Sequence, residues 1–117
     1  MAVKRLYNYS ATVTHVVDGD TFDATVDLGF DVNLNVRIRM AGINTPEMKS
    51  RLVAERVKAQ EAKDFLTQKL SGKQILLDSS GQDKYGRWIG IVKLGTENVN
   101  NTMIEQGLAV KFMEDKI

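Results

Sequence analysis

The chain has 117 residues, of which 43% are hydrophobic and 26% charged, with no cysteine and a formal net charge of +1. This length and composition predict a single soluble globular domain over residues 1–117. The absence of cysteine excludes disulfide scaffolds, thiolate zinc sites and cysteine nucleophiles. No apolar run approaches the ~18 residues of a membrane span, so we expect no membrane partner. We also expect a monomer. The N-terminus shows no signal peptide, which predicts a cytoplasmic protein, or a secreted one if a leader is removed before residue 1.

Three strands are expected in the first third of the chain. Residues 9–16 alternate and are rich in β-branched side chains, Asp18-Gly19 predicts a turn, and a second strand follows over Thr21–Leu28. The third strand, Val32–Met40, has a period of two, which puts Arg37 and Arg39 on the face away from the core. The opposite face of that strand would hold Val32, Leu34, Val36, Ile38 and Met40.

The periodicity ends near the single proline, Pro46, so we expect a loop over residues 41–53. Residues 54–70 have helical spacing and end at Ser71-Gly72, with an apolar stripe of Ala62, Phe65, Leu66 and Leu70. Short strands are expected at 74–78 and 87–94, separated by a polar loop over 79–85. Asn98 is a good N-cap for a short helix that closes at Gly107, and the last ten residues are expected to form a tail.

The resulting order, β-β-β-α-β-β-α, predicts a mainly β protein with some α (α+β). Five strands with a helix between the third and fourth, and a short helix after the fifth, are the element order of the OB-fold, a small Greek-key barrel. If this barrel closes, loops that are far apart in the sequence can converge at one of its ends.

Polar residues gather in three of the expected loops. Asp18 and Asp20 flank the first turn, and the other two groups are Asn44, Thr45 and Glu47, and Lys84, Tyr85 and Arg87. Together with Arg39, they would combine carboxylates with guanidiniums. That composition suits phosphate chemistry, because oxygen ligands hold a hard cation and guanidiniums clamp phosphoryl oxygens. Each group alone also fits an ordinary turn with solvated charges.

In combination, these segments resemble the staphylococcal nuclease (thermonuclease) family. The resemblance rests on four motifs in family order: residues 17–22 (VDGDTF), 36–47 (VRIRMAGINTPE), 83–87 (DKYGR) and 106–109 (QGLA). It implies the barrel fold and a calcium-dependent nuclease. Such an enzyme hydrolyses DNA or RNA phosphodiester bonds and leaves a 5′-hydroxyl and a 3′-phosphate.

The resemblance implies a metal site with few protein ligands. Asp20, Asn44 and the backbone carbonyl of Thr45 would hold one calcium ion, with water and substrate phosphate as the remaining ligands. The family usually has Asp where this chain has Asn44. The loss of one negative charge predicts weaker calcium binding.

The remaining roles that the resemblance implies concern the substrate. Glu47 would orient or deprotonate the attacking water. Arg39 and Arg87 would bind the scissile phosphate and stabilise its developing negative charge. Lys84 and Tyr85 would contact the nucleotide end.

A rival interpretation is a catalytically weak or inactive domain of this family that binds single-stranded nucleic acid or a protein partner. Asn44 favours this rival, whereas the presence of Arg39, Glu47 and Arg87 favours the nuclease.

Two further features bear on the substrate. After residue 109 the family has tyrosines that line the nucleotide pocket, and this chain offers Phe112, Met113 and Asp115 instead. Residues 48–73 carry seven Lys or Arg against three Asp or Glu. Such a basic segment fits either a polyanionic partner or a solvated helix face.

Overall fold

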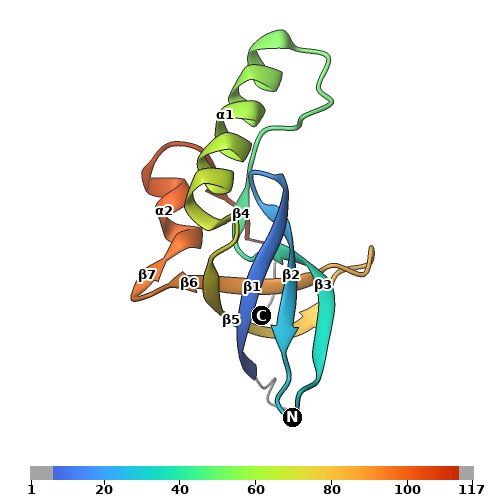
Figure 1. The fold of residues 1–117 in the computed structure, drawn as a ribbon. Helices are drawn as coiled ribbons and strands as arrows, with labels where there is room; N and C mark the ends of the chain where they lie inside the picture. Colours follow the sequence, from blue (N-terminus) through green and yellow to red (C-terminus); the bar gives the residue numbers. More distant parts are fainter. Residues whose placement is uncertain (1–6, 114–117) are drawn as a thin grey trace.

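The computed structural model describes residues 7–113, which form a β-barrel and two α-helices (Figure 1). In chain order the elements are β1 (Tyr7–Asp18), β2 (Thr21–Asp27), β3 (Asn33–Met40), β4 (Ile43–Asn44), α1 (Val53–Leu70), β5 (Gln74–Gln82), β6 (Trp88–Leu94), β7 (Glu97–Asn98), α2 (Val99–Glu105) and β8 (Val110–Lys111). Among these described residues, no helix is long and apolar enough to cross a membrane.

Five strands close into the barrel. β3, β2, β1, β5 and β6 follow one another through antiparallel pairs. The ring is closed by parallel pairing of β3 with β6, in which Ile38 lies opposite Trp88 and Met40 opposite Gly90. The predicted α+β fold, an OB-like five-stranded barrel with a helix between its third and fourth strands, is confirmed.

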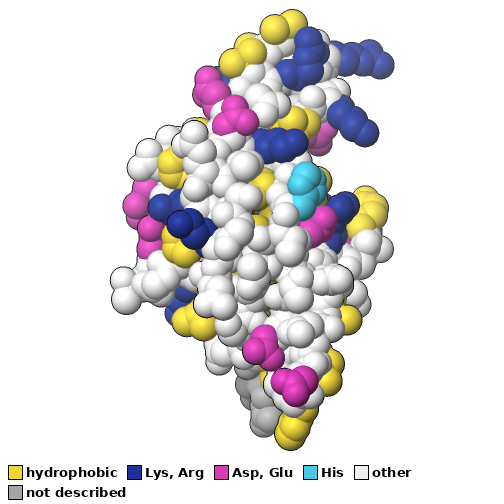
Figure 2. Space-filling model, in the orientation of Figure 1, with side chains coloured by type: hydrophobic (Ala, Val, Ile, Leu, Met, Phe, Trp, Pro, Cys, Tyr) yellow, Lys and Arg dark blue, Asp and Glu magenta, His cyan; other side chains and the backbone are white. Residues whose placement is uncertain are grey.

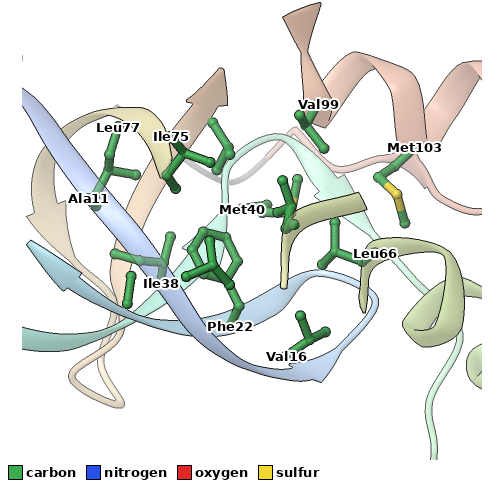
Figure 3. Packing of buried hydrophobic residues seen from close by; sticks show 14 of the residues in the cluster. Ala11, Val16, Phe22, Ile38, Met40, Leu66, Ile75, Leu77, Val99 and Met103 are labelled. Carbon is green, nitrogen blue, oxygen red and sulfur yellow. The ribbon is translucent and has the colours of Figure 1, made fainter. Parts of the chain in front are cut away.

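The core consists of the inward side chains of the strands and one stripe of each helix (Figure 3). Phe22 from β2 and Ile38 from β3 are fully buried inside the barrel. Leu66 of α1 and Met103 of α2 cover the same core. Most of the predicted stripe of α1 is therefore buried, while Phe65 lies half-buried at its margin.

The second helix begins and ends as the sequence predicts. The Asn98 side chain accepts a hydrogen bond from the amide of Asn101 at 3.1 Å, which satisfies one of the free N–H groups of the first turn. Gly107 follows the C-cap residue with φ +73°. Glycine adopts this left-handed conformation without a steric cost, which explains why the helix stops there.

A buried amide ties α2 to the barrel. Asn100 is only 4% exposed, and its side chain accepts from the Val92 amide at 2.9 Å and donates to the carbonyls of Ala41 at 2.8 Å and Gly90 at 3.1 Å. Because a buried polar group is costly unless it is paired, these three bonds fix α2 against β6 and the turn after β3. The residues that follow that turn line the candidate site.

The predicted loop over residues 79–85 is wrong, because β5 continues to Gln82. Ser79 pairs with Gly90, and after a bulge Gly81 pairs with Ile89 and Gln82 with Trp88. Residues 79–82 are polar and show no clear alternation, but their pairing with β6 makes them part of a strand. The true connection is the tight turn between Gln82 and Trp88.

Two other predictions need correction. The expected loop over residues 41–53 contains β4, and the expected tail contains β8, because Ile43 pairs with Lys111 and Asn44 with Val110. This pairing brings the segment after α2 to the site. Asp115, named above with that segment, lies outside the described residues.

The alternation of β3 gives the directions of its side chains but not their burial. Ile38 and Met40 are buried as predicted, whereas Val32 and Leu34 are 51% and 48% exposed, because they lie toward the opposite end of the barrel. There an apolar cavity of about 330 Å³ opens between the strands, with Tyr7, Tyr9 and Trp88 in its wall. Arg39, on the outward face, is only 7% exposed.

Candidate functional site

A cleft of about 830 Å³ opens where three connections meet: the β1–β2 turn, the segment from β4 to α1, and the β5–β6 turn. All eight residues singled out from the sequence line it, namely Asp20, Arg39, Asn44, Thr45, Glu47, Lys84, Tyr85 and Arg87. The closed barrel therefore brings together residues that are up to 67 positions apart in the chain.

The backbone of the β1–β2 turn lies very close to α1 at Gly19. The Asp20 amide donates to Asp18 Oδ1 at 3.1 Å, a local bond typical of Asp in tight turns. A Cβ atom on Gly19 would lie 2.6 Å from the Cβ of Ala62 in α1. Glycine at this position thus allows the turn to approach the helix, and the turn presents both aspartates to the cleft.

Asp20 is a buried carboxylate with several donors. Thr21 Oγ1 donates to Asp20 Oδ1 at 3.0 Å, the Thr45 amide donates to Oδ2 at 3.2 Å, and Arg39 Nη1 lies 3.6 Å from Oδ2. Burial by itself raises the pKa of Asp20, but the hydrogen bonds from Asp18, Thr21 and Thr45 and the charge of Arg39 outweigh it and lower that pKa. Asp20 is therefore ionised.

Asp18 behaves in the opposite way. Burial, followed by the hydrogen bond and negative charge of Asp20, raises the pKa of Asp18 to about 6. Two neighbouring carboxyl groups repel each other when both are ionised, so a positive charge nearby favours that state. Asp18 lines the cleft as well, although the sequence analysis gave it no role beyond the turn.

The guanidinium of Arg39 is fixed on several sides. Nη1 donates to the Met40 carbonyl at 2.6 Å, and Nη2 donates to Asn44 Oδ1 at 3.1 Å. The group also lies over the Phe112 ring, 5.8 Å from its centroid, a favourable cation–π distance. Phe112, which directly follows β8, thus forms part of the cleft wall through the pairing of β8 with β4.

The backbone of Glu47 is anchored while its side chain stays exposed. The Glu47 amide donates to Glu55 Oε1 at 3.3 Å, and Ser50 Oγ donates to Glu55 Oε2 at 2.5 Å. The hydrogen bond from Ser50, and then that from the Glu47 amide, lower the pKa of Glu55. Within residues 7–113 the Glu47 carboxylate has no hydrogen-bond or ion-pair partner, so it is available to a ligand. Glu55, in the first turn of α1, had no role in the sequence analysis.

The β5–β6 turn is organised by one acid. Asp83 accepts hydrogen bonds from the amides of Tyr85 at 2.9 Å and Arg87 at 3.0 Å, and from Arg87 Nε at 2.6 Å. Burial raises the pKa of Asp83, but these bonds and the Arg87 charge lower it overall. Gly86, with φ +82°, completes the turn. Asp83 opens the DKYGR motif four residues before Arg87, and this spacing is the only sign in the sequence of its contact with Arg87.

Two cations flank an exposed aromatic ring in this turn. Lys84 Nζ lies 5.3 Å and the Arg87 guanidinium 5.4 Å from the centroid of the Tyr85 ring, which is 72% exposed. Asp83 binds Arg87 through Nε, and the two terminal nitrogens of Arg87 make no hydrogen bond to any residue in the described part of the chain. Arg87 can therefore donate to an anion in the cleft while its orientation stays fixed.

The donor set of the cleft fits a hard cation held by few protein ligands. Among residues 7–113, no three His, Asp or Glu side chains form a group that could hold a metal by themselves. The available donors are the carboxylates of Asp18 and Asp20, the Asn44 amide oxygen and the Thr45 carbonyl, and oxygen donors suit calcium or magnesium. A bound cation would also favour the ionised state of both carboxyls of the Asp18–Asp20 pair. The Asn44 oxygen already accepts from Arg39, but a carbonyl oxygen has a second lone pair.

Comparison with known proteins agrees with this architecture. The sequence profile of the family described as "Staphylococcal nuclease homologue" matches residues 37–116. The chain is 35% identical over 99 residues to a thermonuclease of Staphylococcus hyicus, an alignment that covers 83% of this chain and 56% of the relative. It is 33% identical over 106 residues to Protein ParB of Escherichia coli, covering 83% of this chain and 54% of the relative.

A third relative, an uncharacterized endonuclease of Haemophilus influenzae, is 28% identical over 102 residues, covering 87% of this chain and 52% of the relative. The chain thus spans about half the length of the curated relatives that it matches. The profile match covers more than half of the chain, and it includes the cleft residues from Arg39 to Arg87. The chain belongs to the staphylococcal nuclease homologue family.

Proposed function

We propose that the chain is a metal-dependent nuclease, with calcium as its metal, that hydrolyses phosphodiester bonds of DNA or RNA. Its membership of the family and its similarity to thermonucleases and to an endonuclease support this function. The observation that carries the proposal is that Arg39 and Arg87, from different loops, line one cleft with Asp20 and Glu47. Each guanidinium is oriented by an acid that engages only part of its donors.

In this proposal the two arginines bind the scissile phosphate. A guanidinium has five N–H donors in a rigid fork, and phosphate oxygens are its natural acceptors. Hydrogen bonds within the described part of the chain use two donors of Arg39 and one of Arg87. The remaining donors would stabilise the negative charge that develops on the phosphoryl oxygens in the transition state, and the fixed orientation of both groups would reduce the cost of reorganisation.

Glu47 would act as the general base. Its unpaired carboxylate would take a proton from a water molecule, whose oxygen forms a bond to phosphorus. The bond from phosphorus to the 5′ oxygen breaks, and the leaving oxygen takes a proton from solvent, which leaves a 3′-phosphate and a 5′-hydroxyl. A calcium ion bound by Asp20, Asn44 and the Thr45 carbonyl would supply positive charge beside the phosphate. Lys84 and the exposed ring of Tyr85 would contact the nucleotide end.

The proposal is tested by cleavage of labelled single-stranded DNA with calcium, with magnesium and with chelator, beside an Arg87→Ala variant. We expect cleavage with calcium and its loss in chelator and in the variant. Glu47→Gln should lower the rate by about 10²-fold or more, the usual contribution of a general base, and leave the melting temperature unchanged because the side chain is exposed. Near-normal activity of Glu47→Gln would refute its role as the base.

One observation favours a second function, binding of single-stranded nucleic acid or a protein partner without cleavage. Asn44 provides no negative charge, and its oxygen accepts from Arg39, so the candidate metal site relies on Asp20 and its neighbour Asp18 for charge. Binding of the labelled strand without cleavage, at saturating calcium, would support this second function and refute the nuclease.

A further inference from the structure

A basic protrusion, defined here as residues 48–58, rises beyond the barrel beside the cleft. It comprises the end of the loop after β4 and the first turns of α1, which stand above the barrel in Figure 1. The first buried residue of α1 is Ala59. The six helical residues before it extend about 9 Å past the packed part of the helix, at ~1.5 Å per residue.

The surface of the basic protrusion combines cations with apolar side chains. Its cations are Lys49, Arg51, Arg56 and Lys58, all exposed. Leu52, Val53 and Val57 are 67%, 64% and 52% exposed. Figure 2 shows Lys and Arg side chains together with hydrophobic ones at this end of the molecule.

These four cations are not held in ion pairs within the described part of the chain, and with the one acid Glu55 the protrusion keeps a formal charge of +3. The Arg56 guanidinium donates to the neutral carbonyl of Ser50 at 2.7 Å. The one acid of the protrusion, Glu55, is engaged by Ser50 and the Glu47 amide. The cations do not stabilise α1 either, because the dipole of a helix disfavours positive charge near its first turn.

We propose that the basic protrusion binds the sugar-phosphate backbone of the same nucleic-acid strand outside the cleft. The inference rests on the proposed function, since it takes nucleic acid as the substrate. Lys49 lines the cleft and also belongs to the protrusion, so the positive surface is continuous from the reaction site outward. The span of about 9 Å corresponds to two to three nucleotide steps of a stacked strand, which rises ~3.4 Å along its axis per phosphate.

The physical consequence is a salt-dependent contribution to affinity that short substrates lack. Each phosphate contact on a single strand releases counterions and adds about 0.7 to the slope of log K against log salt. The exposed apolar side chains would pack against sugars and unpaired bases between these contacts. The same composition would also suit an anionic membrane surface, but the continuity with the cleft favours nucleic acid.

The test compares two double variants that remove the same net charge. Arg51→Gln with Lys58→Gln removes cations of the protrusion that do not line the cleft, whereas Lys73→Gln with Lys111→Gln removes exposed cations elsewhere on the surface that also line no part of the cleft. Both are made with and without Glu47→Gln. In the Glu47→Gln background, the affinity for a labelled single strand several times longer than the cleft is measured by fluorescence anisotropy over a range of salt, with calcium present.

We expect the protrusion variant to reduce the salt slope by about 1.4, which makes the loss of affinity between about 50 and 200 mM salt roughly sevenfold smaller. The control variant should keep the parental slope. With Glu47 intact, hydrolysis of a dinucleotide should be equal in both variants, while hydrolysis of the long strand should fall only in the protrusion variant.

Equal slopes for the two double variants would overturn the inference. Unchanged DNA binding by the protrusion variant, combined with loss of its binding to phosphatidylserine vesicles, would overturn it in favour of a membrane surface. Because anisotropy needs no cleavage, a difference in slope without any hydrolysis by the parent chain would refute the nuclease and leave the inference standing.

Discussion

The orientation of Arg87 depends on Asp83, and Asp83→Asn tests this dependence with little change in shape. The variant keeps an oxygen that can accept from the amides of Tyr85 and Arg87. The charged oxygen that lies 2.6 Å from Arg87 Nε becomes the neutral NH₂ group of the amide. This group cannot accept a hydrogen bond from Arg87. The turn should therefore form, whereas the charged hydrogen bond that orients the guanidinium is lost.

The magnitude follows from the exposure of the pair. A hydrogen bond between charged groups contributes about 1.5–3 kcal/mol, and the lower end applies because the side chains of Arg87 and Asp83 are 30% and 17% exposed. A loss of about 1.4 kcal/mol reduces the equilibrium constant for the productive orientation of Arg87 about tenfold, which sets the upper limit for the fall in the fraction of molecules that hold it. We expect kcat/KM on single-stranded DNA to fall by a factor between about two and ten. A surface ion pair adds at most about 1 kcal/mol to stability, so the melting temperature should fall by less than about 8 °C.

Asp23→Asn is the matched control. Asp23 pairs with Arg37 Nε at 2.8 Å, and these side chains are 31% and 50% exposed, but neither residue lines the cleft. The control removes the same charge from a similar pair and should change the melting temperature by a similar amount without changing kcat/KM. Equal loss of activity in the two variants, or full activity of Asp83→Asn, would refute the positioning role of Asp83.

Three further variants test the cleft. Asn44→Asp restores a negative charge next to Arg39 and should lower the calcium concentration for half-maximal activity; an unchanged or higher requirement would remove this residue from the metal site. Glu55→Ala deletes the acceptor of the Glu47 amide and should lower kcat about fivefold with little change in KM, corresponding to ~1 kcal/mol for one hydrogen bond, and Glu55→Gln should recover part of the loss. Unchanged kcat in Glu55→Ala would contradict this role. Gly19→Ala places a Cβ 2.6 Å from that of Ala62 and should destabilise the fold by about 1–3 kcal/mol, seen as a lower melting temperature; a wild-type melting curve would mean that the turn moves freely.

The sequence predicted the barrel because its strands alternate strongly and its turns carry glycine. The segment 79–82 and the short strands β4 and β8 escaped prediction for a common reason. Their residues are polar or too few for a period to be visible, and they are strands only because a partner pairs with them. Such pairing is a tertiary effect that overrides local preference.

In the cleft, too, the local sequence predicts some features, while others depend on tertiary contacts. Alternation put Arg39 on the outward face of β3, but it could not reveal that Asp20 and Phe112 cover this face at the end of the strand. The groups that touch a ligand carry recognisable chemistry in the sequence. The residues that hold them, such as Asp83 and Glu55, are ordinary acids whose roles depend on distances that only the folded chain defines.

The cations of the cleft and those of the basic protrusion have different roles in this proposal: the first act on the scissile phosphate, and the second attract the strand. In the cleft each arginine faces an acid, Arg39 with Asp20 and Arg87 with Asp83, so these guanidiniums contribute little to the field at a distance. Four cations without such partners lie close together on the basic protrusion, and we expect salt-dependent attraction of a polyanion to begin there. A net charge of +1 is therefore compatible with a nucleic-acid substrate. If this division holds, protrusion variants will change affinity and its salt dependence, while Asp83→Asn will change turnover at every salt concentration.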